Sequence, residues 1–137
     1  MKTFINIIAI GLILLPSVIY AQQTKDKKIH PIPKVISYKP NSNQYQPLLE
    51  GEKDSAVFYS GVVTLLPDSA GEIHSTKNYE EMIIPLKGQG IVKLNNHQTR
   101  SLTYGKIALI PPLTEHQVVN TGKDVLKHIY VATKVKQ

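Results

Sequence analysis

The amino-acid sequence predicts an all-β domain, either a sandwich or a barrel. Residues 55 to 133 contain apolar segments of about five residues, and Gly, Pro or Asn turns separate them. No stretch of this region repeats its apolar residues with the 3.6-residue period of an amphipathic helix. Short strands at this spacing, without helices between them, are typical of antiparallel sheets that close on themselves.

The expected strands follow one another with only short turns between them. Asn95-Asn96 is a tight-hairpin signal, because Asn tolerates the positive φ that such a turn needs. Pro85 falls inside an expected strand, and we predict it at an edge or a bulge because it has no N–H to donate. The expected strands are 56–66, 81–86, 90–94, 98–102, 107–110, 116–119 and 125–132.

Length, cysteine content and charge limit the classes of protein to consider. The chain has 137 residues, enough for one domain with a core. It has no cysteine, which excludes disulfides and thiolate ligands. The formal net charge of +6 comes from scattered Lys residues, which indicates a solvated basic surface with a mild bias toward anionic ligands. Nucleic-acid binding is not expected, because there is a single arginine and no alternation of basic and aromatic residues.

Residues 1–21 are predicted to be a signal peptide. Lys2 precedes an apolar run, 4–18, which is short for a membrane span. Ala21 supplies the small residue of a cleavage site, but Ile19 is larger than the residue usual two positions earlier, so an uncleaved anchor is the alternative. We therefore expect a periplasmic or extracellular protein whose only membrane contact is this transient segment.

The next segment, 22–50, is predicted to be an irregular N-terminal extension. It is polar and rich in Pro and Asn, residues that oppose long helices and central strands. The β-domain itself is predicted to occupy 51–137.

Two stretches concentrate side chains that bind metals or move protons. The first contains His74 and Glu81, and the second contains His116. Side chains alternate along a strand, so His74 and Thr76 are expected on one face, with Glu81 facing them across a pairing strand. Two His and one carboxylate, with other coordination positions open, suit a divalent transition metal such as Fe, Mn or Zn. The sequence leaves the metal open, and a barrel without metal is the alternative.

In order and spacing, the two stretches resemble the two signature motifs of the cupin superfamily. The first motif is Gly-x5-His-x-His-x3–4-Glu-x6-Gly, and the second is Gly-x5-Pro-x-Gly-x2-His-x3-Asn. The corresponding residues here are Asp68, His74, Thr76, Glu81 and Gly88, followed by Gly105, Pro111, Leu113, His116 and Asn120. The resemblance covers residues 56 to 133. It implies a single cupin-type jelly-roll β-barrel behind the irregular N-terminal extension.

The sequence departs from the family pattern at three of these positions. Asp68 and Leu113 replace turn glycines. Thr76 stands where the family has a second metal-binding His, so the resemblance implies three protein ligands, namely His74, Glu81 and His116. Thr76 is then expected to hold a metal-bound water or a group of the substrate. Glu80 is the alternative ligand if the motif uses its shorter spacer, although the spacing to Gly88 favours Glu81.

Two further residues are candidates for proton transfer. If Leu126 faces inward, alternation along the strand places His128 and Tyr130 inside the barrel. His128 is then a candidate general acid or base, and the alternative is a histidine that only packs there. Asn120 is expected to fix a turn with its side chain.

The resemblance implies a broad functional class only. The first reading is a metal-dependent enzyme, an oxygenase, isomerase or lyase, that acts on a small carboxylate or sugar-like molecule. The second is a non-catalytic small-ligand or carbohydrate-binding module with a degenerate metal site, and the third is a structural barrel. The family also commonly forms homodimers, here through exchange of residues 32–50.

Overall fold

The computed structural model describes residues 32–54, 56–95 and 97–135. The predicted signal peptide, residues 1–21, lies outside this part of the chain. Among the described residues, no helix has the length and apolar character needed to cross a membrane.

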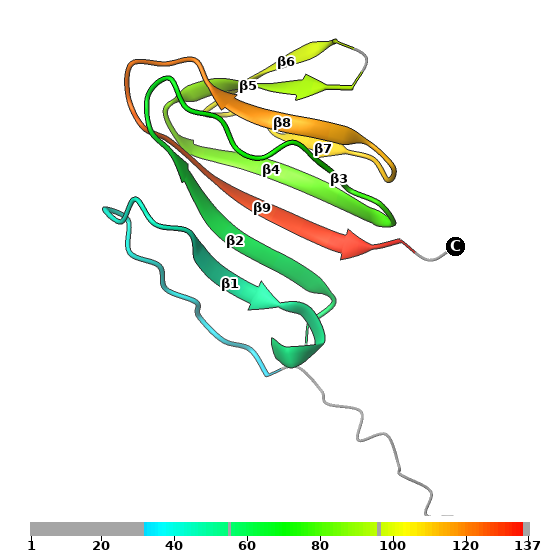
Figure 1. Ribbon diagram of the computed structural model, residues 1–137. Coiled ribbons are helices and arrows are strands. Elements are labelled where there is room, and N and C mark those ends of the chain that lie inside the picture. Colours follow the sequence, from blue (N-terminus) through cyan, green and yellow to red (C-terminus); the bar gives the residue numbers. More distant parts are fainter. Residues whose placement is uncertain (1–31, 55, 96, 136–137) are drawn as a thin grey trace, which may run out of the picture.

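The described residues form two antiparallel sheets that face each other (Figure 1). One sheet has the strand order β1-β2-β9-β4-β7 and the other has the order β3-β8-β5-β6. The strands are β1 (Gln46–Glu50), β2 (Phe58–Leu65), β3 (His74–Ser75), β4 (Tyr79–Lys87), β5 (Gln89–Leu94), β6 (Thr99–Thr103), β7 (Ala108–Ile110), β8 (Glu115–Asn120) and β9 (Leu126–Lys134), with a 3-10 helix, η1 (Gly51–Asp54), after β1. This arrangement confirms the predicted all-β jelly roll.

Each strand expected from the sequence is present, and β5 and β6 pair antiparallel on either side of Asn95. Asn96, the other residue of the predicted hairpin signal, lies outside the described residues. Pro85 lies beside a shift in the β4–β9 register, as predicted for a residue that cannot donate to the ladder. The strands begin earlier than expected, because Gln46–Glu50 pairs with β2 as an edge strand although it precedes the predicted boundary at residue 51.

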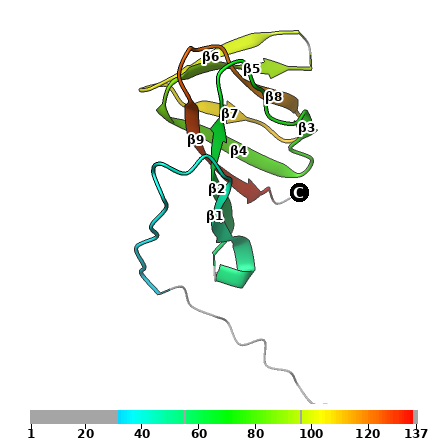
Figure 2. The ribbon, with the colours of Figure 1, turned by 60° about the vertical axis from the view of Figure 1, so that its left-hand side comes forward.

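The hydrophobic core fills one end of the space between the sheets. Its centre is a cluster of buried aliphatic side chains that both sheets contribute, among them Ile83, Val92, Leu102, Ile110 and Leu126. Full burial of each such side chain stabilises the fold by about 1.5–3 kcal/mol. At the other end, β1 and much of β2 extend beyond the four-stranded sheet (Figures 1 and 2). His74, whose side chain is 53% exposed, and Tyr45, which is 55% exposed, lie where the space between the sheets opens to solvent.

Residues 32–45, here called the arm, precede β1, and Pro40 and Ser42 within it lie against the outer face of the five-stranded sheet. The Lys127 ammonium, only 6% exposed, donates hydrogen bonds to the carbonyl oxygens of Pro40 and Ser42. The Gln46 side chain makes two hydrogen bonds with the backbone of Lys39: its Oε1 accepts from the N–H, and its Nε2 donates to the carbonyl oxygen. The arm therefore enters β1 from a fixed position.

Asn120 fixes the turn between β8 and β9, which confirms its predicted role. Its side-chain Nδ2 donates to the carbonyl oxygens of Leu65, Leu66 and Asp124 at 2.8–3.0 Å. Its Oδ1 accepts from the N–H of Gly122 at 2.9 Å. One buried amide thus joins the end of β2 to the turn that precedes β9.

Candidate metal centre

Three side chains from three strands converge in the open end of the barrel. His74 comes from β3, Glu81 from β4 and His116 from β8. The Glu81 Oε2 atom lies 3.7 Å from His74 Nε2 and 3.5 Å from His116 Nε2. Their candidate ligand atoms all lie within 4.8 Å of one another. The three predicted ligands therefore meet. Glu80, the alternative, alternates with Glu81 along β4 and points to the other face of the sheet.

The strands that carry these residues pair differently from the prediction. His74 pairs directly with His116 in the β3–β8 ladder, and the two imidazole rings lie 4.4 Å apart between centroids. Glu81 was expected on a strand paired with that of His74, and this was wrong. It belongs to the opposite sheet and reaches the histidines across the barrel interior.

The cause is the short connection between β3 and β4. Lys77 has a left-handed backbone, with φ of 50°, and the Tyr79 N–H bonds to the Thr76 carbonyl at 2.9 Å. This tight turn passes the chain from one sheet to the other. Consecutive strands thus supply two ligands from facing walls.

Both imidazole rings are oriented by their Nδ1 atoms. His74 Nδ1 lies 3.1 Å from the Glu72 carbonyl oxygen, and His116 Nδ1 lies 3.4 Å from the Thr114 carbonyl oxygen. A ring that uses Nδ1–H in this way presents an unprotonated Nε2, the form that binds a metal. His116 Nε2 is buried and has no hydrogen-bond partner in the described part of the chain. This donor set fits a divalent transition metal.

The charges in the site also favour a metal ion. Burial raises the pKa of Glu81, and the nearby His74 opposes that rise. Burial also lowers the pKa of His116, and repulsion from His74 lowers it further. His116 thus resists protonation and offers little positive charge to the carboxylate. A bound cation would supply that charge.

Thr76 has a structural use in addition to its position at the site. Its hydroxyl donates to the Pro111 carbonyl oxygen at 2.8 Å and accepts from the Thr114 N–H at 3.0 Å. It therefore holds the turn that leads into β8 and His116. Thr76 also lines the cavity described next.

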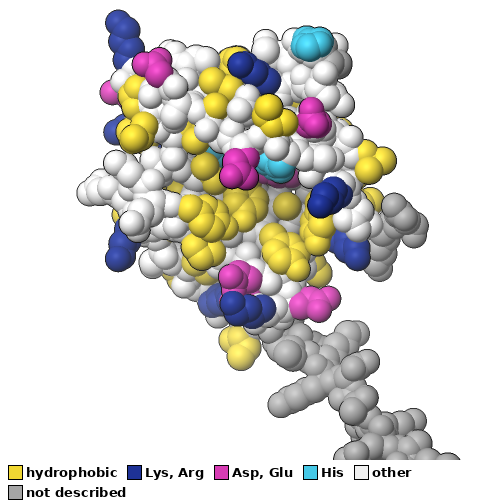
Figure 3. Space-filling view, in the orientation of Figure 1, with side chains coloured by type: hydrophobic (Ala, Val, Ile, Leu, Met, Phe, Trp, Pro, Cys, Tyr) yellow, Lys and Arg dark blue, Asp and Glu magenta, His cyan; other side chains and the backbone are white. Residues whose placement is uncertain are grey.

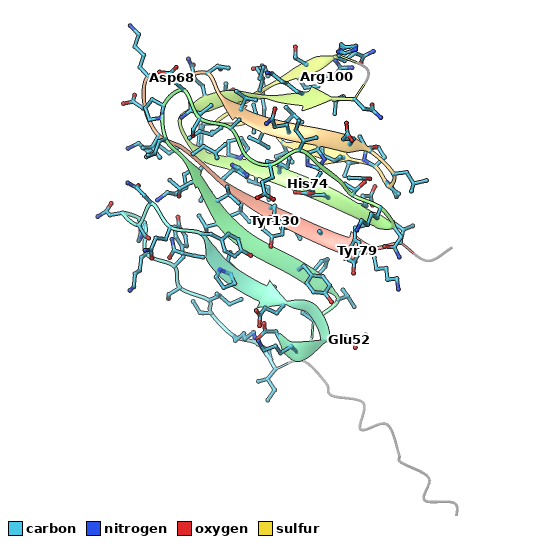
Figure 4. The ribbon with its side chains drawn as sticks, in the orientation of Figure 1. Glu52, Asp68, His74, Tyr79, Arg100 and Tyr130 are labelled. Carbon is cyan, nitrogen blue, oxygen red and sulfur yellow. The ribbon has the colours of Figure 1, made fainter. Side chains whose placement is uncertain are left out.

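A cavity of about 790 Å³ adjoins the three candidate ligands. His128 and Tyr130 line it from β9, as the alternation of that strand predicts. Figure 3 shows hydrophobic side chains gathered beside a histidine and acidic side chains in the middle of this face. Figure 4 shows His74 on the wall formed by the four-stranded sheet, with Tyr130 below it on β9. The volume falls within the usual range for small-molecule sites.

The two candidates for proton transfer have strongly shifted pKa values. Burial lowers the pKa of His128 to about 4, and its Nδ1 has no hydrogen-bond partner among the described residues. Burial raises the pKa of Tyr130 well above its usual value, and the hydrogen bond with Tyr45 adds to that rise. At neutral pH, the cavity therefore presents a neutral imidazole and a neutral phenol.

Sequence reasoning missed Tyr45 as a residue of this cavity. Its hydroxyl lies 2.9 Å from that of Tyr130, and its side chain lines the same space as His74 and Glu81. Tyr45 lies within the segment predicted to be irregular, where no motif distinguishes it. Only its position just before a strand could have suggested that it is ordered.

Comparisons with known proteins agree with this fold. In a search of solved structures, an RmlC-like cupin family protein from Methanocaldococcus jannaschii matches with a TM-score of 0.65 and 19% identity, over 75% of this chain and 92% of that one. A cupin protein from Bacteroides fragilis matches with a TM-score of 0.61 and 17% identity, over 76% and 86% of the two chains. A predicted oxalate decarboxylase from Thermotoga maritima matches with a TM-score of 0.57 and 21% identity, over 66% and 79%.

A comparison with curated proteins gave no match. The family model described as "Cupin domain" matches residues 61–132. That match spans the strands from β2 to β9 and includes all three candidate metal ligands. The chain therefore belongs to the cupin domain family.

Proposed function

We propose that this cupin binds one divalent transition metal, Fe, Mn or Zn, through His74, Glu81 and His116. The observation that carries the proposal is the buried Nε2 of His116, which has no hydrogen-bond partner in the described part of the chain and lies 3.5 Å from Glu81. An unsatisfied buried nitrogen costs about 1–3 kcal/mol. A metal ion between the imidazole and the carboxylate would remove that cost.

We further propose that the protein is an enzyme acting on a small polar molecule, carboxylate or sugar-like, in the adjacent cavity. The metal, when bound, supplies a Lewis acid with open positions for an oxygen of the substrate. His128 is neutral at neutral pH, so its unpartnered ring nitrogen is the group we assign to accept a hydrogen bond from the proton that the bound molecule gives up. Tyr130 keeps its proton and donates a hydrogen bond. Thr76 holds a water or a substrate group at the edge of the site. Oxygenase, isomerase and lyase reactions are all compatible with these groups.

A second candidate function is non-catalytic binding of a small ligand or carbohydrate. The hydrogen bonds of Thr76 favour it, because its hydroxyl already serves the Pro111 carbonyl and the Thr114 N–H. In this reading, the substitution of the family's second histidine marks a degenerate metal site, and the cavity binds without turnover.

We also propose that the protein is exported to the periplasm or beyond, and that it forms a homodimer. The apolar run at 4–18 supports export. Support for a dimer comes from β1, which ends the five-stranded sheet and leaves one backbone edge available to another chain. In the structure, β1 pairs with β2 of its own chain. The N-terminus of the secreted protein and its mass by light scattering test the two proposals.

The first experiment is elemental analysis of the purified protein beside two variants. We expect about one equivalent of metal in the wild type and its loss in His116→Ala. His97→Ala is the matched control, because His97 is exposed near the β5–β6 turn and is expected to leave the metal content unchanged. If no metal binds after reconstitution with Fe(II), Mn(II) and Zn(II), the metal proposal is wrong and ligand binding without metal takes its place.

A further inference from the structure

Two tyrosines meet in the cavity that the three candidate metal ligands also line. Tyr45 comes from the end of the arm, and Tyr130 from the middle of β9. Their hydroxyl oxygens lie 2.9 Å apart, and both side chains line the cavity that contains His74, Glu81 and His116. Figure 4 shows Tyr130 on the central part of the five-stranded sheet, between His74 and the lower strands.

Gly61 creates the space that the pair occupies. It is directly opposite Tyr130 in the β2–β9 register. A Cβ atom at Gly61 would lie 2.7 Å from the Tyr45 ring and 3.0 Å from the Tyr130 ring, closer than such contacts normally come. A glycine inside a strand commonly marks a close approach of another group. Here, the missing side chain lets the Tyr45 ring lie against β2 and reach Tyr130.

The pair retains one hydrogen for a ligand. In a bond between two phenols, one O–H donates and the other oxygen accepts, so the accepting phenol still has its own O–H. The described part of the chain supplies no acceptor for that second hydrogen. A hydroxyl that accepts one hydrogen bond becomes a better donor in the next one. The pair is therefore a preformed donor of a hydrogen bond, and its oxygens also accept.

The charge around the cavity limits what this donor can bind. Among the described residues that line it, none is Lys or Arg, and two, Glu72 and Glu81, are acidic. An anionic group placed near the tyrosines would face two acidic side chains and no cationic partner. The neighbouring wall is apolar, with Val63, Val118 and Ala132. This end of the cavity suits an uncharged oxygen next to an apolar or ring-shaped part of a molecule.

We propose that Tyr45 and Tyr130 form a second, metal-independent subsite, which binds an uncharged carbonyl or hydroxyl oxygen of the ligand. The proposal deepens the proposed function, because it rests on the same cavity being the ligand site. It assigns two parts of the cavity to different groups of one molecule. A metal held by His74, Glu81 and His116 would supply a Lewis acid for one oxygen of the ligand, and the phenol pair binds a second, uncharged oxygen.

A matched pair of probes tests the subsite in metal-free protein. Benzamide and benzoate have the same ring and nearly the same shape, but only benzoate is charged. Protein with ¹³C at the tyrosine Cζ position is titrated with each probe, and the resonances of Tyr45 and Tyr130 are followed by NMR. We expect benzamide to shift both resonances in a saturable way, and benzoate to bind severalfold more weakly.

Three variants and one control connect the shifts to the pair. Tyr45→Phe and Tyr130→Phe each remove one hydroxyl and are expected to weaken benzamide binding about fivefold, the effect of one hydrogen bond. Gly61→Ala keeps both hydroxyls but displaces the rings, and we expect a similar loss. Tyr104→Phe is the control, because Tyr104 is 82% exposed and does not line the cavity. It is expected to change nothing.

The possible outcomes separate this subsite from the metal centre. The subsite is refuted if benzamide leaves both resonances unmoved, if benzoate binds as tightly as benzamide, or if both Phe variants bind benzamide as the wild type does. The same titration in His116→Ala is expected to match the wild type, since the subsite needs no metal. If the protein binds metal but not benzamide, the metal proposal stands and the subsite proposal is wrong. If it binds benzamide but no metal, the subsite proposal stands and the metal proposal is wrong.

Discussion

His116 and His128 are both buried histidines that face one cavity, but they come from opposite sheets and have different neighbours. Each has one ring nitrogen without a hydrogen-bond partner in the described residues. The free nitrogen of His116 lies 3.5 Å from the Glu81 carboxylate and next to His74. For His128, burial alone accounts for its lowered pKa. Burial thus favours the neutral form of both rings. Only His116, which lies beside a carboxylate and a second imidazole, has the surroundings of a metal ligand.

The largest expected effect concerns His128 and pH. Its pKa is about 4 in the folded protein and 6.5 when exposed. As the pH falls below 6.5, the unfolded chain binds a proton that the folded protein does not bind until about pH 4. Stability is therefore complete above pH 6.5 and declines toward pH 4, by roughly 3 kcal/mol from this residue.

Urea unfolding at pH 7 and pH 4.5 measures that loss. His128→Leu is expected to lose less stability over this range than the wild type, because the variant has no buried imidazole to protonate. His97→Ala removes an exposed histidine and is expected to behave as the wild type does. An equal loss in wild type and His128→Leu would contradict the assignment of a buried, neutral imidazole to His128.

The next effect concerns the metal. A metal at a hundredfold excess over its Kd stabilises a protein that binds it only when folded, by about 2.7 kcal/mol. We expect thermal unfolding to show this gain in the wild type and in His128→Ala, and to show none in His116→Ala. If His128→Ala also loses the gain, then His128 takes the place of the family's second histidine, and the contrast between the two residues is wrong.

The smallest effect concerns the turn that delivers His116. Leu113 has φ of 59° and is 80% exposed, so its side chain has little packing to offset a left-handed backbone. This conformation costs an L-residue about 1–2 kcal/mol. Glycine avoids that cost, but it loses more conformational entropy on folding, which offsets part of the gain. Leu113→Gly is expected to raise stability by about 1 kcal/mol in urea unfolding.

Asp68 is the matched position for that substitution. It also has a left-handed backbone, with φ of 59°, and it also replaces a family glycine. Asp tolerates this region better than Leu, so Asp68→Gly is expected to gain less. Equal gains at both positions would show that the strain is not specific to the turn before His116.

The strands and the three candidate ligands could be predicted because their signals are local. Apolar alternation indicates strands, and the spacing of His74, Glu81 and His116 carries the family pattern. The partner of β3 could not be predicted in the same way. Neighbouring strands usually pair, but the turn at Lys77 sends β4 to the other sheet, and this choice depends on strands far along the chain.

The surroundings of Tyr45 and Lys127 could not be predicted either, because their partners lie far away in the sequence. Tyr45 acquires its place in the cavity from a contact with a residue 85 positions later. Lys127 lies on the outer face of its strand, as alternation suggests, but it is buried because the arm covers it. The alternating pattern of the strand predicts a solvent-exposed lysine here. No neighbouring residue in the sequence indicates that its ammonium group binds the carbonyl oxygens of Pro40 and Ser42.

The position of β9 has a consequence for how the protein is made. It is the last strand in sequence order, yet it lies in the middle of the five-stranded sheet, between β2 and β4. A nascent chain that lacks Leu126–Lys134 has no partner for the facing edges of β2 and β4, and it lacks His128 and Tyr130. The sheet can therefore close only after nearly all of the domain has left the ribosome.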